Sequence, residues 1–227
     1  MDLGGLPPAE TVTDRVYGRL YDSIVELRLT PGQKISEVEV AQQFDVSRQP
    51  VRDAFYRLSR LGFLTIRPQR ATVVSPISPE GVMRACFMRT GIEIEVLELL
   101  GTLPETRENG LSQAEAMVEL QCSALSGDDR VRFHELDDAM HRALFEAAGK
   151  GFAWDVVRES KAHMDRVRHI SLELGARQPY DDHLYLLDAL RRGDVGAAKE
   201  RMRRHLGRVS DVMEQAMLEK PELFAPA

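Results

Sequence analysis

The sequence predicts a mainly α-helical protein in two parts. An N-terminal winged helix-turn-helix with a small β-wing is followed by an all-α bundle of six to seven helices. Apolar residues recur at helical spacing over most of the chain, whereas β-prone runs are confined to residues 63–66 and 72–74. The proline-containing joint at residues 75–79 ends the second run and can start a helix. We therefore expect one domain over residues 1–75 and another over residues 76–227.

The first two helices of the N-terminal part follow from apolar spacing and capping signals. Residues 13–29 carry apolar side chains three to four positions apart, and a Pro-Gly pair ends the segment. Ser36 and Glu39 have the spacing of a capping box, which predicts a short second helix through Phe44. Only two residues then separate this helix from the next signal for a helix start.

The third helix begins after Ser47, which can cap it, and Pro50 falls in its first turn. Its buried stripe recurs at helical spacing and consists of Val51, Ala54, Phe55 and Leu58. The polar side chains near the start of this helix lie outside the stripe; they are Arg48, Gln49 and Arg52. Helix-turn-helix proteins insert this end of the helix into the major groove of DNA, where arginine pairs with guanine. A solvated basic face is the other interpretation of these residues.

A cationic wing completes this part. The two β-prone runs are joined by Arg67-Pro68-Gln69-Arg70-Ala71, which predicts a hairpin with a basic tip. Residues 48–70 hold six arginines and one aspartate, although the whole chain has a formal net charge of −6. Local positive charge of this kind displaces counterions from a DNA duplex, so an acidic total does not exclude DNA binding.

The remainder of the chain is helical in pattern. The expected helices are separated by glycine-containing turns and cover residues 79–100, 112–125, 129–148, 152–174, 179–192 and 195–218. Cys86 and Cys122 lie far apart without metal or redox spacing, and no apolar run reaches membrane-spanning length. We expect a cytoplasmic protein with free thiols and no membrane partner.

Candidate metal ligands lie on inward faces of three of these helices. Asp137 and His141 are four residues apart on one helix face and can reach one metal, although such a pair is also a common surface contact. His183 and His205 lie on apolar faces of later helices. Three imidazoles and a carboxylate favour a borderline divalent ion, with zinc expected and nickel as the alternative. Arg166 and Arg168 follow an apolar stripe, so one of them could point inward at a carboxylate, but a solvated face is the preferred interpretation.

The N-terminal motifs resemble the GntR family of bacterial regulators. The residues that carry the resemblance are Leu29-Thr30-Pro31-Gly32, Ile35-Ser36-Glu37, Val40-Ala41, Val46-Ser47-Arg48-Gln49-Pro50-Val51-Arg52-Asp53-Ala54, Leu58, Gly62 and Arg67-Pro68-Gln69-Arg70. The resemblance implies that Arg48 and Arg52 contact operator DNA and that Ser47 and Gln49 support them. It also implies that the wing around Arg70 reaches the minor groove or the backbone.

The C-terminal motifs are similar to the FCD domain of the FadR-type subgroup of that family. The matching residues are Phe133, Asp137, His141, Leu144, Ala148-Gly149, Asp182-His183, Leu187-Asp188-Ala189-Leu190, Gly193-Asp194, Ala197-Ala198, Met202 and His205-Leu206. This similarity implies a homodimer in which Asp137, His141, His183 and His205 bind a metal and a small carboxylate effector completes the coordination. Arg89 occupies the place of an effector-binding arginine, with an ion pair to Glu93 as the alternative.

The expected function is that of a DNA-binding transcriptional regulator, a repressor whose operator binding is modulated by a small carboxylate at the metal site. One alternative is a metal-dependent enzyme acting on small organic acids. The sequence offers no nucleophile motif or Gly-rich phosphate loop for it, so we expect no enzymatic activity. The other alternative is a metal-independent regulator that senses a larger acyl ligand, against which the four intact candidate ligands argue.

Overall fold

The structure is a computed structural model. It describes residues 11–66, 71–170 and 177–226, without the side chains of residues 104–107 and 109. The chain forms two compact units: Met1–Ser78 together with Glu222–Ala227, and Pro79–Pro221. The C-terminal residues therefore pack with the first unit, whereas the sequence analysis gave everything after residue 75 to the second.

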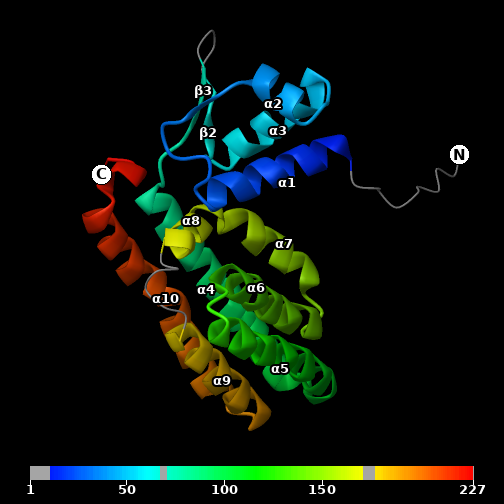
Figure 1. Ribbon diagram of the computed structural model, residues 1–227. Coiled ribbons are helices and arrows are strands. Elements are labelled where there is room, and N and C mark those ends of the chain that lie inside the picture. Colours follow the sequence, from blue (N-terminus) through cyan, green and yellow to red (C-terminus); the bar gives the residue numbers. More distant parts are fainter. Residues whose placement is uncertain (1–10, 67–70, 171–176, 227) are drawn as a thin grey trace, which may run out of the picture. The chain divides into compact units, whose positions relative to one another are not determined.

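The first unit combines three helices with a small sheet (Figure 1). Its elements in chain order are α1 (Val12–Val25), β1 (Lys34–Ile35), α2 (Glu37–Gln43), α3 (Arg48–Arg60), β2 (Leu64–Thr65) and β3 (Thr72–Val74). The sheet is antiparallel in the order β1-β3-β2, with Leu64 opposite Val74 and Lys34 opposite Val73. The predicted pairing of the two β-prone runs is confirmed, whereas the tip at residues 67–70 lies outside the described residues. The strand β1 was not predicted, because two residues are too few to show an alternating pattern.

Capping in the first unit differs from the expectation. A complete capping box stands at Thr11 and Asp14: the Thr11 hydroxyl accepts the Asp14 N–H and the Asp14 carboxylate accepts the Thr11 N–H, both at 3.1 Å. The Ser36 hydroxyl accepts the N–H of the second residue of α2 at 3.2 Å, a single cap in place of the box expected with Glu39. Ser47 holds the N-cap position of α3 without a side-chain capping bond. The helix starts were thus predicted better than the contacts that fix them.

The core of the first unit is formed by the apolar stripes of α1 and α3 and by the sheet. Its buried members are Val16, Leu20, Ile24, Val51, Ala54, Phe55, Leu58, Phe63, Leu64 and Val74. Asp45, between α2 and α3, has a φ of 51°. Aspartate tolerates this left-handed conformation better than most residues, which permits the tight turn between the two helices.

The last described residues add to the first unit. Ile77 and Phe224 form an isolated parallel bridge, in which the Ile77 N–H donates to Leu223 and the Ala225 N–H donates to Ile77, both at 2.8 Å. The Phe224 side chain is buried. This pairing follows a short 3-10 turn, Pro221–Leu223, and explains why the C-terminus belongs to the first unit.

The second unit is a bundle of seven described helices, which confirms the predicted class (Figure 1). They are α4 (Pro79–Thr102), α5 (Pro104–Ser126), α6 (Arg130–Ala147), α7 (Gly151–Ser160), α8 (Ala162–Ile170), α9 (Arg177–Arg191) and α10 (Val195–Glu219). Over the described part of the helix expected at residues 152–174, the structure has two helices that break at Lys161. α5 begins earlier than expected, because Pro104 suits a first helical position.

The packing of the bundle brings α5 onto α6, and α10 onto α4 and α9. The two helices of the first pair come close together at Gly110 of α5, where an added Cβ would lie 2.0 Å from the Cβ of Ala147 on α6. Glycine is required there by space, since this helix crossing leaves no room for a side chain. None of the described helices is long and apolar enough to cross a membrane.

Candidate functional site

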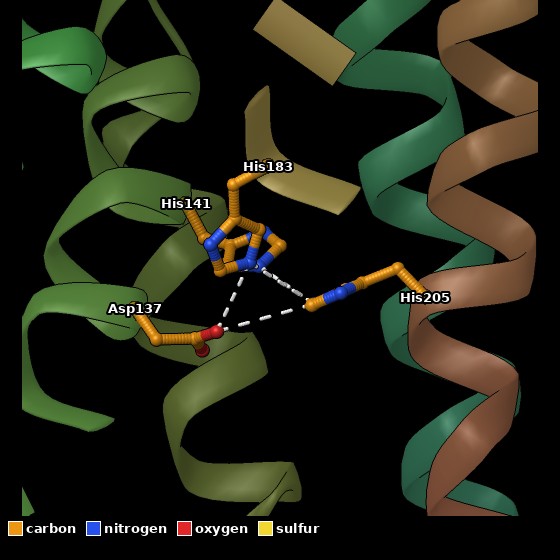
Figure 2. A group of neighbouring side chains, drawn as sticks. All are labelled: Asp137, His141, His183 and His205. Carbon is orange, nitrogen blue, oxygen red and sulfur yellow. Dashed lines mark hydrogen bonds and ion pairs between the residues drawn. The ribbon is translucent and has the colours of Figure 1, made fainter. Parts of the chain in front are cut away.

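Four polar side chains meet inside the second unit. Figure 2 shows Asp137 and His141 projecting from α6 toward His183 of α9 and His205 of α10. One ligand atom of each residue lies within 4.8 Å of all the others. The first three side chains are almost fully buried, and His205 is 10% exposed. The structure thus brings together all four residues that the sequence analysis named as metal ligands.

The atoms that converge are the Nε2 atoms of the three histidines and one carboxylate oxygen. The Nε2 atom of His205 lies 3.3 Å from that of His141 and 3.4 Å from that of His183. The Oδ1 atom of Asp137 lies 3.1 Å from His183 Nε2 and 4.0 Å from His205 Nε2. The four atoms therefore surround one small space.

The opposite nitrogen of each ring faces an oxygen. His141 Nδ1 lies 2.5 Å from Glu93 Oε2, His183 Nδ1 lies 2.8 Å from Gln121 Oε1, and His205 Nδ1 lies 3.5 Å from Asp182 Oδ2. A ring that donates Nδ1–H to such an acceptor keeps a lone pair on Nε2. All three lone pairs then point at one another and at a carboxylate.

This donor set fits a divalent cation. Converging lone pairs repel unless a positive charge lies between them, and three imidazoles with one carboxylate are ligands that zinc and nickel accept. Burial lowers the pKa of His205 to about 3 and also lowers the pKa of His183. Burial opposes ionisation of Asp137, but Arg168 and nearby imidazoles hold its pKa well below its ordinary value. Neutral imidazole and ionised carboxylate are the forms that bind metals.

Arg89 is paired with Glu93, as the alternative interpretation proposed. Its Nε–H donates to Glu93 Oε1 at 2.5 Å, and both side chains are only 2% exposed. The other Glu93 oxygen faces His141. Burial acts against the charged form of Glu93, but Arg89 and His141 lower its pKa to about 2. The Nη2 atom of Arg89 has no hydrogen-bond partner within the described part of the chain, so the ion pair leaves one donor of the guanidinium available.

Arg168 is a site residue for which the preferred interpretation, a solvated face, was wrong and the alternative of an inward-pointing arginine holds. It is 15% exposed and donates to Asp137 Oδ2 at 2.5 Å and to Asp138 at 3.0 Å. Lys161 extends this network to Asp138 and Asp165, each at 2.7 Å. Arg168 therefore occupies one oxygen of Asp137 and leaves the other for the histidine cluster. The expectation for Arg166 was also wrong, because this residue is fully buried.

A cavity of about 90 Å³ adjoins the cluster. Asp137 and His205 form one part of its wall, and three arginines, Arg89, Arg168 and Arg208, form another. The remaining lining is largely apolar. Arg208 stands one turn beyond His205 on α10 and pairs with Asp182. The three-residue spacing between His205 and Arg208 places the two side chains on neighbouring positions of α10, and this was the only signal in the sequence for Arg208. The sequence did not show which side of α10 Arg208 faces.

The predicted DNA-reading residues lie on the exposed start of α3. Arg48 and Arg52 both reach the Oε2 atom of Glu37 on α2, at 3.3 Å and 3.4 Å. Gln49 donates to Asp53 at 2.9 Å. All three named readers are exposed, so they are accessible to a ligand as large as a duplex. The contacts of Glu37 with the two arginines, and the hydrogen bond that Asp53 accepts from Gln49, were not anticipated from the sequence.

Two further predicted residues have a weaker structural basis. Ser47 is exposed at the start of α3 and makes no capping bond, which leaves its hydroxyl accessible. Arg70 lies outside the described residues.

Comparisons with known proteins find a matching family for each of the two units. Residues 12–74 match the family described as bacterial regulatory proteins, gntR family, and residues 85–208 match the FCD domain. The HTH-type transcriptional repressor RspR of Escherichia coli K12 is 34% identical over 226 residues, which cover 97% of this chain and 96% of that protein. An uncharacterized HTH-type transcriptional regulator of Streptomyces ambofaciens is 32% identical over 92% of this chain and 88% of its own length.

Solved structures show the same fold. E. coli McbR/YncC has a TM-score of 0.76 at 18% identity and covers 90% of this chain and 98% of its own. A GntR-type protein from Rhodococcus has a TM-score of 0.70 at 22% identity, with coverage of 89% and 97%. The relatives are transcriptional regulators, not enzymes. The chain therefore belongs to the GntR family of transcriptional regulators, in the FadR-type subgroup, with an N-terminal helix-turn-helix and a C-terminal FCD domain.

Proposed function

We propose that this regulator is a repressor that senses a small carboxylate at a metal site in its FCD domain and binds its operator as a homodimer. The observation that carries the proposal is the convergence of three Nε2 atoms and Asp137 Oδ1 beside an arginine-lined cavity. Repression is supported by the relative from Escherichia coli, which is named a repressor.

Asp137, His141, His183 and His205 would hold the ion, with zinc as the proposed metal and nickel as the alternative. The bound ion would supply positive charge that attracts an anionic ligand. Around it, Glu93 and Gln121 orient the rings of His141 and His183 by accepting their Nδ1–H groups, and Asp182 lies 3.5 Å from the Nδ1 atom of His205. Oxygen partners of this kind fix ring orientation and raise the basicity of the ligating nitrogen.

Arg89 would bind the carboxylate of the effector. Its guanidinium lines the cavity, Glu93 fixes its orientation, and its Nη2 group has no other partner among the described residues. A cavity of about 90 Å³ beside the Asp/His cluster has room for a small acid.

Arg48, Arg52 and Gln49 would read the operator from the major groove, with Ser47 and the wing residue Arg70 contacting the duplex beside them. One such helix covers only one half-site, so two copies on a two-fold operator are needed for a full site. Effector binding would favour a packing of the FCD helices in which the two reading helices no longer match the half-site spacing.

A thermal-shift screen against small mono-, di- and hydroxycarboxylates, with and without chelator, tests the sensor. Ligand at about 100 times its Kd adds roughly 2.7 kcal/mol, a rise in Tm of several degrees for a domain of this size. We expect the rise to vanish with chelator. The double variant His183→Ala/His205→Ala should lose its metal and still bind DNA, and full metal occupancy in that variant would contradict the ligand set.

Selection of duplexes from a random library tests the DNA half of the proposal. We expect an inverted repeat, bound with two protein chains per duplex. With that duplex, Arg52→Ala should weaken specific binding by about 1–3 kcal/mol. Unchanged affinity in this variant would refute the assignment of α3 as the reading helix.

A further inference from the structure

We infer that the effector is a short dicarboxylate, held by Arg89 at one end and by Arg208 at the other. This inference rests on the proposed carboxylate-sensing function and adds the chemical class of the ligand and a second anchoring residue. It follows from unpartnered donors, from the balance of buried charge and from the size and lining of the cavity.

Two guanidinium groups in the cavity wall have an unused donor. The Nη2 atom of Arg89 and the Nη1 atom of Arg208 are buried and have no hydrogen-bond partner within the described part of the chain. Each group is fixed by a carboxylate through another nitrogen, Arg89 by Glu93 and Arg208 by Asp182. A buried donor is costly unless an acceptor meets it, so each arginine presents an unmet donor at the cavity.

The two donors belong to different helices, α4 and α10, and both residues line the same cavity. Arg168 also lines the cavity, but its ion pairs already join it to Asp137, Asp138 and Asp165. The cavity wall therefore contains two arginines with an unmet donor and a third arginine that is already paired with carboxylates.

The charges around the cavity give the ionic class. Within the described residues, the ion-pair network that surrounds the cluster joins five cations to five anions: Arg89, Lys161, Arg168, Arg201 and Arg208, and Glu93, Asp137, Asp138, Asp165 and Asp182. Arg204 also approaches Asp182, at 3.7 Å, but is 59% exposed and screened by water. These ion-paired cations and anions balance one another, and the buried Arg166 adds a further positive charge to the second unit.

A divalent ion held by neutral histidines adds two positive charges to this balanced network. A monocarboxylate compensates one of them and leaves a buried positive charge, which is unfavourable away from water. A dicarboxylate compensates both. Phe133, Met164 and Val209 provide apolar wall in the same cavity, which suits a short hydrocarbon spacer between the two carboxylates.

The test compares succinate with butyrate, which share a four-carbon chain and differ in the second carboxylate. Isothermal titration of the zinc-loaded protein should give a Kd for succinate roughly 10- to 100-fold below that for butyrate, as expected for added charge-assisted hydrogen bonds. Arg208→Met keeps the aliphatic stem and should reduce this preference to within about threefold without loss of zinc. Asp182 keeps a partner in this variant, because Arg201 still donates to it at 3.0 Å.

Arg204→Met is the matched control, since Arg204 lies on the same helix and approaches the same carboxylate from an exposed position. It should retain the preference for succinate. Equal affinity for the two acids in the unmodified protein, or an undiminished preference in Arg208→Met, would overturn the inference while leaving the sensor intact. The proposed function itself fails in a different way, when neither acid binds or when chelator has no effect on binding.

Discussion

The buried pair of Arg89 and Glu93 gives a sharp quantitative prediction. Both side chains are 2% exposed and 2.5 Å apart, and Glu93 also accepts from His141. Glu93→Gln keeps the shape and an acceptor for His141 but leaves Arg89 charged and unneutralised. Removing one partner of such a pair costs about 3–5 kcal/mol, whereas removing both costs far less. Glu93→Gln should therefore be strongly destabilising, and Arg89→Met/Glu93→Gln should recover at least about 2 kcal/mol of that loss.

Urea unfolding in the presence of chelator measures this cycle without a contribution from metal binding. The single tryptophan, Trp154, is buried in α7, so its fluorescence reports the second unit alone. Arg142 and Glu146 on α6 have the same spacing and a 2.8 Å contact but are 60% and 46% exposed. Glu146→Gln should cost less than about 0.5 kcal/mol. A Glu93→Gln loss as small as that of this exposed control would refute the reasoning.

Three further predictions concern packing, DNA discrimination and pH. Gly110→Ala should destabilise the second unit by about 1–3 kcal/mol in the same urea assay, because its Cβ meets Ala147, whereas Gly91→Ala, with open space around it, should be neutral or stabilising. Glu37→Gln removes the carboxylate between Arg48 and Arg52, so binding to non-operator DNA should tighten and the salt dependence of that binding should steepen by about one counterion. Glu39→Gln, at an exposed position of the same helix, should have a smaller effect on both quantities, as measured by anisotropy titrations at several salt concentrations. The Thr11 hydroxyl and Arg57 lower the pKa of Asp14 from 3.8 to about 2, so the stabilising contribution of the Asp14 carboxylate is complete above pH 4 and is lost as pH falls through 2. The difference in Tm between the unmodified protein and Asp14→Asn should therefore shrink over that interval, and a difference that does not change with pH would contradict the prediction.

The sequence was informative wherever a single helix carried the signal. Asp137 and His141 are four residues apart, and His183 and His205 interrupt apolar stripes, so each could be recognised as inward-facing from local spacing alone. The cap residue Ser36 and the stripe of α3 were recognisable for the same reason.

Contacts between helices were not predictable in this way. Gln121 and Asp182 face histidine rings from positions that depend on how α5, α9 and α10 pack. For Arg168 a solvated face was preferred because spacing along its own helix does not show the two aspartates of α6 that it contacts, Asp137 and Asp138. The break at Lys161 escaped notice because no glycine or proline marks it; the lysine is buried by its ion pairs to Asp138 and Asp165.

The bridge between Ile77 and Phe224 has a consequence for how the protein is made. Glu222–Ala227 belongs to the same compact unit as the helix-turn-helix, but the ribosome adds it only after the whole of Pro79–Pro221. A nascent chain therefore contains α3 before that unit is complete, and a chain that stops prematurely inside the FCD domain lacks Glu222–Ala227. The helix-turn-helix unit is thus completed late in synthesis, and only in chains that already contain all four residues of the Asp/His cluster.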